Sequence, residues 1–159
     1  MQGVFISTRC ARMLFGICFA FITFGFADAQ QLLNNPLPVY GNWCGPDYPQ
    51  VLANARPPVD PLDAACMRHD YCVAAQGRFD CGCDISLLVE LRNTHWSNPY
   101  IHNNARGVYD AIALAPCSNP NGLAYKQSMF AKDLISDTVT GRGTPADVFD
   151  RWRRLLVGP

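Results

Sequence analysis

The clearest hydrophobic pattern of the chain lies between Asp60 and Gly77, where apolar and cysteine side chains recur with the 3.6-residue period of an α-helix. Asp60 is a favourable N-cap, and Pro61 suits the first helical position because an N–H there has no intrahelical partner. Gly77 is a typical residue at which a helix stops. The pattern therefore predicts a helix that begins after Asp60 and ends before Gly77.

This helix carries a histidine and an aspartate on different sides. At about 100° per residue, His69 lies at the centre of the buried face, with Cys66 and Cys72 about 60° to either side. Asp70 lies about 100° from His69, on the flank of that face. One interpretation is a disulfide-linked core helix whose histidine is merely buried. The functional interpretation is that His69 points at a partner helix and Asp70 at a neighbouring loop.

A second helix is predicted from Asp84 to Arg92, with one face formed at positions i, i+3, i+4 and i+7. The residues on that face are Asp84, Leu87, Leu88 and Leu91. In the structural interpretation Asp84 is the N-cap of this helix. In the functional interpretation Asp84 meets His69 across two antiparallel helices.

The rest of the chain also favours helices. We expect a loop over residues 93–104, helices over 105–115 and 123–135, and a turn at 119–122. Few strand signals occur. The fold class is therefore predicted to be mainly α, in a small domain linked by disulfides.

A last helix is predicted after Thr144, because Thr144, Pro145 and Asp147 form an N-terminal capping pattern. Its apolar face includes Phe149 and Trp152, beside three arginines. Such a helix suits either a membrane surface or docking on the core with its arginines solvated.

The first 29 residues have the pattern of a secretory signal peptide. Two arginines precede an uncharged apolar run from Met13 to Phe26, and Ala27 and Ala29 form a small-x-small cleavage site. The run of 14 residues is short for a helix that spans a bilayer. We therefore expect a secreted protein in which residues 30–159 form one domain.

Charge and cysteine content narrow the functional classes. The formal net charge is zero, so no overall positive field recommends nucleic acid as a partner. Of the eight cysteines, six follow the predicted leader, and in a secreted chain an even number indicates three disulfides. A zinc site around Cys66, His69 and Cys72 is the competing interpretation, weakened by the lack of a standard Cys-x-x-Cys pair.

Three motifs with specific spacing occur within residues 40–92. They read Gly41-x-Trp43-Cys44-Gly45, then Pro58-x-Asp60-x-x-Asp63-x-x-Cys66-x-x-His69-Asp70-x-Cys72, then Cys81-x-Cys83-Asp84. In these motifs the chain resembles the secreted, calcium-dependent phospholipases A2. The resemblance implies a small α-domain with two antiparallel helices and a calcium-binding loop.

The resemblance also implies a role for each matched residue. His69 would be the general base that takes a proton from water, and Asp84 the carboxylate that orients its imidazole. Asp70 would be the side-chain ligand of Ca²⁺. The backbone ligands would be the carbonyls of Trp43, Gly45 and Asp47. The Gly45 N–H would act with the cation on the oxyanion of the substrate ester.

These implied roles are chemically coherent. Ca²⁺ takes about six to eight oxygen ligands, so three carbonyls and one bidentate carboxylate leave room for water or substrate. A histidine with an ordinary pKa near 6.5 accepts a proton at neutral pH, so no serine or cysteine nucleophile is needed. The disulfides implied by the resemblance join Cys44 to Cys66 and Cys72 to Cys83, which leaves Cys81 with Cys117.

Two positions depart from the family's pattern. Asp47 replaces a loop glycine, and Val73 replaces a tyrosine whose hydroxyl supports the carboxylate at the position of Asp84. Asp47 either weakens calcium binding or adds a ligand of its own. Without a tyrosine at position 73, Asp84 needs another donor, such as a tyrosine from elsewhere or water.

The leading hypothesis is a secreted hydrolase that cleaves the sn-2 ester of glycerophospholipids at a membrane or micelle surface, with Ca²⁺ as cofactor and lipid degradation as its role. The alternative, favoured by Asp47 and Val73, is a phospholipase-like binding protein with weak or no turnover. A third hypothesis is a disulfide-rich module in which the neighbouring His69 and Asp70 have no catalytic role.

Overall fold

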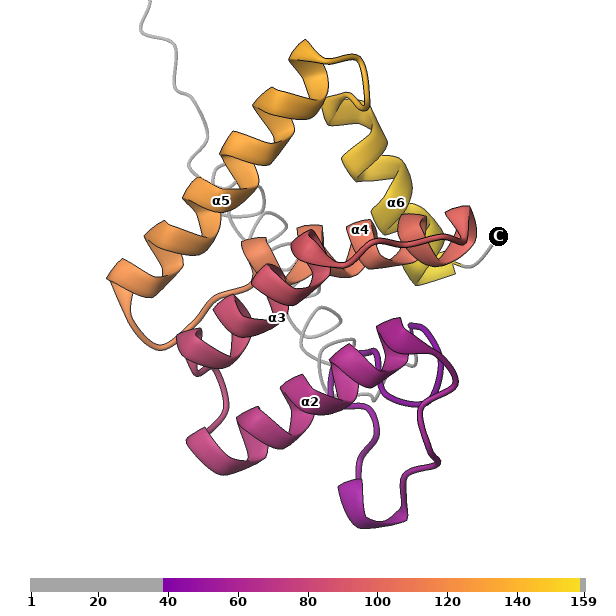
Figure 1. Ribbon diagram of the computed structural model, residues 1–159. Coiled ribbons are helices and arrows are strands. Elements are labelled where there is room, and N and C mark those ends of the chain that lie inside the picture. The colour runs from indigo at the N-terminus through magenta and orange to yellow at the C-terminus, as the bar shows by residue number, and fades with distance from the viewer. Residues whose placement is uncertain (1–38, 158–159) are drawn as a thin grey trace, which may run out of the picture. The chain divides into compact units, whose positions relative to one another are not determined.

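The computed structural model describes residues 39–157, so the predicted signal peptide over residues 1–29 lies outside the described residues. Within this range the fold is a small, mainly α domain of five α-helices, with no β-sheet (Figure 1). Its elements are the 3₁₀-helix η1 (Leu52–Asn54) and the α-helices α2 (Pro61–Gln76), α3 (Cys81–Asn93), α4 (Pro99–Leu114), α5 (Pro120–Val139) and α6 (Pro145–Val157).

Local capping signals set the ends of α2 as predicted. The Asp60 side chain accepts a hydrogen bond from the Asp63 N–H, Pro61 occupies the first helical position, and Gly77 follows the last residue. Helix α3 starts three residues earlier than predicted, because Asp80 is its N-cap and accepts from the Cys83 N–H. The interpretation of Asp84 as the N-cap is therefore wrong.

Two further boundaries differ from the sequence predictions. The expected loop over residues 93–104 contains the start of α4, where Asn98 caps the helix and Pro99 takes the first position. The expected turn at 119–122 is the first turn of α5, capped by Asn119, whose side chain accepts from the Gly122 N–H. Both helices start at an Asn-Pro pair, which combines an N-cap with a proline that does not need a donor.

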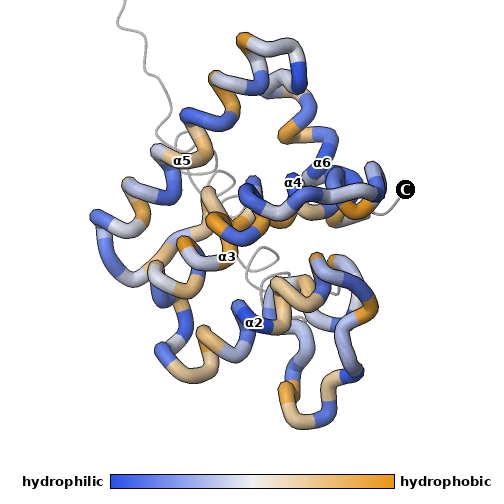
Figure 2. Tube along the Cα trace, viewed as in Figure 1, coloured by the Kyte–Doolittle hydropathy of each residue, from blue (hydrophilic) through white to orange (hydrophobic). Residues whose placement is uncertain are grey.

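The core lies where α2, α3, α4 and α5 meet. Helix α3 packs against α2, α4 and α5, and its three leucines at positions 87, 88 and 91 are buried as predicted. The other large apolar core residues are Trp43, Leu62, Val108, Tyr109 and Met129. Figure 2 shows hydrophobic and hydrophilic segments alternating along the helices, as expected when each helix buries one face.

Three disulfides link the domain, with the pairing that the family resemblance implied. They join Cys44 to Cys66, Cys72 to Cys83, and Cys81 to Cys117. Because Cys66 and Cys72 are both in disulfides, the zinc interpretation is wrong. A disulfide-rich domain of this kind is consistent with an extracellular protein. None of the helices within residues 39–157 combines the length and apolar character needed to cross a bilayer.

Helix α6 docks on α4 at a glycine. A side chain at Gly107 would lie 2.5 Å from Leu155, so the absence of one lets the two helices approach closely. Phe149, predicted on the docked face, is 73% exposed, and Arg151, predicted to be solvated, is largely buried against Asp110. The docking interpretation is therefore confirmed, with Leu155 in the contact and Phe149 outside it.

Candidate functional site

The loop that precedes α2 is organised by one fully buried carboxylate. Asp63 accepts hydrogen bonds from the backbone N–H groups of Asn42, Trp43 and Val59, at 2.8 to 3.0 Å. Gly41 makes this approach possible, because it adopts a φ of +60° and a Cβ there would lie 2.5 Å from Asp63 Oδ1. The loop backbone is therefore held against the first turn of α2.

Two further links hold this loop. The Cys44–Cys66 disulfide joins it covalently to the middle of α2. The buried Trp43 ring donates from Nε1 to the Arg56 carbonyl, at 2.8 Å. Among the described residues, no donor binds the carbonyl oxygens of Trp43 or Asp47, and the Gly45 N–H donates to none of them. The Gly45 carbonyl accepts a 3.3 Å hydrogen bond from the Tyr48 N–H.

His69 and Asp84 meet across α2 and α3, as the functional interpretation predicted. The distance from His69 Nε2 to Asp84 Oδ1 is 2.9 Å, and the nearby Cys72–Cys83 disulfide fixes the two helices to each other. The helices run antiparallel, because Arg68 precedes Cys72 in α2 whereas its partner Glu90 follows Cys83 in α3. When Nε2 carries the proton that Asp84 accepts, Nδ1 is left as the basic nitrogen of the imidazole.

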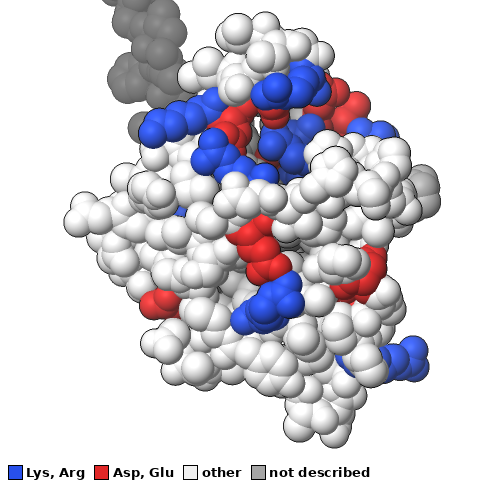
Figure 3. All heavy atoms as spheres, in the orientation of Figure 1, with Lys and Arg blue, Asp and Glu red and all other residues white. Residues whose placement is uncertain are grey.

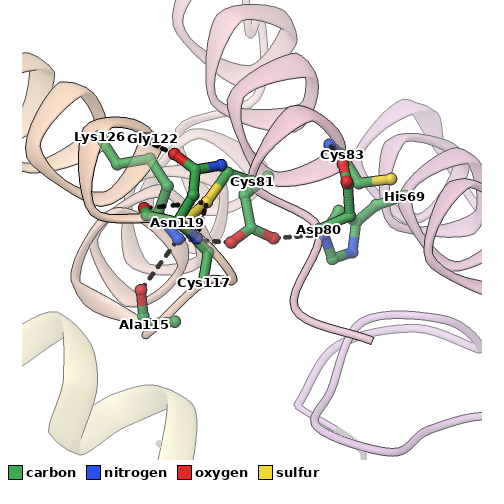
Figure 4. Close-up of a disulfide and its surroundings, with 10 residues drawn as sticks. His69, Asp80, Cys81, Cys83, Ala115, Cys117, Asn119, Gly122 and Lys126 are labelled. Atoms are coloured by element: carbon green, nitrogen blue, oxygen red, sulfur yellow. Dashed lines mark hydrogen bonds and ion pairs between the residues drawn. A yellow bond between two sulfur atoms is a disulfide. The ribbon is translucent and has the colours of Figure 1, made fainter. Parts of the chain in front are cut away.

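Lys126 is a residue of this site that sequence reasoning missed. Its side chain is completely buried, and Nζ donates to Asp84 Oδ2 and, at 2.9 Å, to the carbonyl of Ala115 at the C-terminus of α4. Asp84 thus has His69 on one oxygen and Lys126 on the other. Figure 4 shows His69 and Lys126 entering the site from opposite sides.

The position of Lys126 follows from a close approach of α5 to α3. A side chain at Gly122 would lie 2.6 Å from the Cys81 sulfur, so these two helix starts are in contact. Lys126 is one turn further along α5, and Asp84 one turn further along α3, which brings the two charges together. Val73 provides no hydroxyl, and the donor to Asp84 is Lys126 instead of the predicted tyrosine or water.

Asp70 lies beside His69 with one oxygen unpaired. Asp70 Oδ1 is 3.9 Å from His69 Nδ1, while Oδ2 is buried and has no hydrogen-bond partner among the described residues. Burial raises the pKa of Asp70, and the charge of Asp63, which binds the loop, raises it further. A buried carboxylate oxygen without a donor is available to a cation.

The oxygen atoms available here fit Ca²⁺ better than a transition metal. The described residues contain no cluster of three His, Cys, Asp or Glu side chains able to hold a metal. The orphaned oxygen of Asp70 and the unpaired carbonyls of Trp43 and Asp47 are all hard oxygen donors, which Ca²⁺ prefers. The donor set is therefore compatible with the calcium site that the resemblance implied.

The carboxylate of Asp47 forms an ion pair with Arg78. Both of its oxygens are within 2.8 Å of Arg78 Nη2, in an ion pair on the surface. Its backbone has a φ of +53°, in the left-handed region where glycine is usual and where Asp is among the better tolerated residues. In this arrangement the Asp47 side chain is a partner of Arg78, while its carbonyl is free of backbone hydrogen bonds.

His69 holds a proton strongly between its two acidic neighbours. Burial lowers the pKa of the imidazole, but the carboxylates of Asp70 and Asp84 outweigh it and raise the pKa of His69 to about 9. His95 and His102 are both exposed, as predicted for histidines outside the site.

The sequence matches no protein-family model, and no curated protein or solved structure is significantly similar to it. Functional inference therefore depends on the arrangement of the described residues.

Proposed function

We propose that the protein is a secreted, calcium-dependent phospholipase A2, which hydrolyses the sn-2 ester of glycerophospholipids. The observation that carries this proposal is the 2.9 Å contact between His69 and Asp84, with the other imidazole nitrogen facing a carboxylate whose second oxygen is buried and unpaired. A base, its orienting acid and a candidate cation ligand are thus adjacent, as hydrolysis by an activated water requires.

The base and its support come entirely from side chains of this domain. Asp84 holds the proton of His69 on Nε2, so that Nδ1 is the nitrogen that removes a proton from the attacking water. Lys126 binds the remaining oxygen of Asp84 and restricts rotation of the carboxylate. His69 then returns the proton to the leaving alcohol of the lysophospholipid, which restores the resting state.

Asp70 and the carbonyls of Trp43, Gly45 and Asp47 are the groups that would hold the cation. Bound Ca²⁺ supplies Lewis-acid stabilisation of the ester oxygen as it gains negative charge. The Gly45 N–H, which has no partner among the described residues, is available to donate to the same oxygen. The Cys44–Cys66 disulfide and the bonds to Asp63 keep this loop fixed relative to His69.

The charge on Asp70 also governs the protonation of His69. With both neighbouring carboxylates ionised, the pKa of His69 is about 9, so both ring nitrogens are protonated at neutral pH. Once the charge of Asp70 is compensated, one of the interactions that raise this pKa is lost. A cation held by Asp70 would therefore lower the pKa of His69 and favour Nδ1 as a proton acceptor.

Secretion and a peripheral lipid partner belong to the same proposal. The predicted signal peptide and three disulfides support an extracellular location. The substrate would be presented at a phospholipid membrane or micelle surface.

The test is release of fatty acid from phospholipid vesicles, measured with calcium and with excess chelator. We expect hydrolysis in calcium, loss with chelator, and a loss of at least a hundredfold in His69→Gln, since a general base contributes about 10² to 10⁴ in rate. His95→Gln is the matched control, because His95 is exposed and outside the site. Hydrolysis that persists with chelator or in His69→Gln refutes the proposal. Calcium binding without hydrolysis in the native chain would favour a phospholipase-like binding protein instead.

A further inference from the structure

A polar cavity lies between α4, α5 and α6, and His69 is not among its lining residues. Its volume is about 240 Å³, enough for several water molecules at about 30 Å³ each or for one small ligand. Three arginines line it: Arg106 from α4, Arg142 from the turn after α5, and Arg151 from α6. Figure 3 shows the basic and acidic side chains gathered around a hollow in this part of the surface.

The arginines are held in place by two aspartates, Asp137 in the cavity lining and Asp110 behind Arg151. Arg106 Nη2 lies 2.5 Å from Asp137, and Arg142 Nε lies 3.2 Å from the other oxygen of the same carboxylate. Arg151 binds Asp110 through both Nε and Nη2, at 2.7 Å. The side chains of Arg106 and Arg151 are only 25% and 13% exposed, so these two guanidinium groups have fixed orientations.

Each guanidinium retains donors that no described residue uses. Arg106 is bonded only through Nη2, and Nη1 of Arg142 and of Arg151 makes no hydrogen bond within residues 39–157. None of these nitrogens is both buried and unsatisfied, so they are reached by solvent. The lining arginines therefore retain N–H groups without acceptors, and those of Arg106 and Arg151 belong to side chains with fixed orientations.

The charges around the cavity do not balance. Three arginines line it, whereas Asp137 is the one acidic side chain in the lining and Asp110 lies behind Arg151. A neighbouring pocket of about 220 Å³ shares Arg106, Asp137 and Arg142, and adds the pair Arg92 and Asp133. With Asp110 counted, three arginines face two aspartates at each of the two pockets.

We propose that this cavity is a binding site for a phosphate group, separate from the candidate calcium site. Phosphate matches what the cavity offers, because its oxygens accept paired N–H donors from guanidinium groups and its negative charge balances the excess arginine charge. The ligand is either a free phosphate or the phosphate of a lipid head group, since both present the same oxygens to Arg106, Arg142 and Arg151.

Calorimetric titration with inorganic phosphate tests this site, at an ionic strength held constant with sodium chloride so that screening does not change. We expect saturable binding that weakens about tenfold or more in Arg142→Ala, because a charge-assisted hydrogen bond is lost. Arg142 is 62% exposed, so its removal leaves the fold intact, which urea unfolding checks. Arg153→Ala is the matched control, since Arg153 is similarly exposed on α6 but does not line the cavity.

A second arm distinguishes the two sources of phosphate. Binding to vesicles of phosphatidylcholine is compared with binding to vesicles that also contain phosphatidic acid, in the native chain and in both variants. If inorganic phosphate binds and Arg142→Ala weakens that binding, the ligand is free phosphate. If vesicle binding requires phosphatidic acid and Arg142→Ala abolishes it, the ligand is a lipid head group. The proposal is overturned if neither ligand binds, or if Arg142→Ala and Arg153→Ala bind equally well.

Discussion

Lys126 binds the oxygen of Asp84 that His69 leaves free. The lysine side chain has no exposed surface, and the Asp84 side chain is 9% exposed, so both charges are withdrawn from water. Such a burial is tolerated only when the charges are paired and further hydrogen bonds satisfy the remaining donors, as the carbonyl of Ala115 does here. The orientation of His69 therefore depends on a residue more than 50 positions further along the chain.

Replacing Lys126 with methionine should destabilise the fold strongly. The substitution keeps an unbranched side chain, one atom shorter, but removes the lysine charge that pairs with the buried Asp84, which costs about 3 to 5 kcal/mol. Urea unfolding measures this change. Lys132→Met is the matched control, because Lys132 is exposed on the same helix and its loss should cost less than about 0.5 kcal/mol.

The double variant Lys126→Met with Asp84→Asn separates charge pairing from packing. Removing both charges should recover part of the stability lost in Lys126→Met, because the remaining amide does not carry an uncompensated charge. If the effects of the two single substitutions add without coupling, the two charges do not form the pair described here.

The helix ends that were predicted correctly are those set by residues at the ends themselves. Asp60, Pro61 and Gly77 set the ends of α2 through their own backbone preferences, so the helix with His69 was predictable. The start of α4 carried the same kind of signal in Asn98 and Pro99, but the polar residues that follow it obscured the helical period.

Lys126 was not predictable in the same way. It falls on one helical face with Met129, Phe130 and Asp133, so its place in a buried stripe was visible in the sequence. Lysine is almost never fully buried unless it is paired, and its partner is supplied by another helix. Only the contact between Gly122 and Cys81, which is a property of the tertiary fold, brings that partner within reach.

The stability of the calcium-free protein should fall as the pH rises through the alkaline range. The pKa of His69 is about 9 in the folded state, against an ordinary value of 6.5 for an imidazole in the unfolded chain, so the folded protein binds the proton more tightly. Its contribution, on the order of 3 kcal/mol, is complete below pH 6.5 and is lost as the pH approaches 9. Urea unfolding of the native chain and of His69→Gln in chelator measures the difference.

A direct titration of the imidazole gives the second readout. Nuclear magnetic resonance of the histidine ring protons in chelator should show His69 with a midpoint near 9. A midpoint equal to that of a histidine in the urea-unfolded chain, or a stability difference that does not change with pH, would contradict the proton-holding role of Asp70 and Asp84.

Calcium affinity should depend on Asp70 and much less on the side chain of Asp47. Asp70→Asn removes the charge from the unpaired buried oxygen and should weaken binding by at least a hundredfold. Asp47→Gly removes only a carboxylate that binds Arg78, and glycine suits the φ of +53°, so the affinity should change less than about threefold. Calorimetry with Ca²⁺ compares the two variants, and a larger loss in Asp47→Gly would place that carboxylate among the ligands.

Gly41→Ala should disrupt the loop that precedes α2. The added Cβ would lie 2.5 Å from Asp63 Oδ1, so the carboxylate must move and its bonds to the N–H groups of Asn42 and Trp43 must lengthen. Because Asp63 is fully buried, donors that lose it are left unsatisfied, and with the positive φ we expect a loss of about 3 kcal/mol or more.

Gly141→Ala is the control that isolates this contact from backbone strain. Gly141 has a similar φ of +70°, but nothing lies within 4 Å of a Cβ at that position, so only the cost of the left-handed conformation, about 1 to 2 kcal/mol, should appear. Urea unfolding gives both values. A loss in Gly41→Ala no larger than that in Gly141→Ala would mean that Asp63 can move without cost. In that case the carboxylate would not be what holds Trp43 and Gly45 in place beside α2.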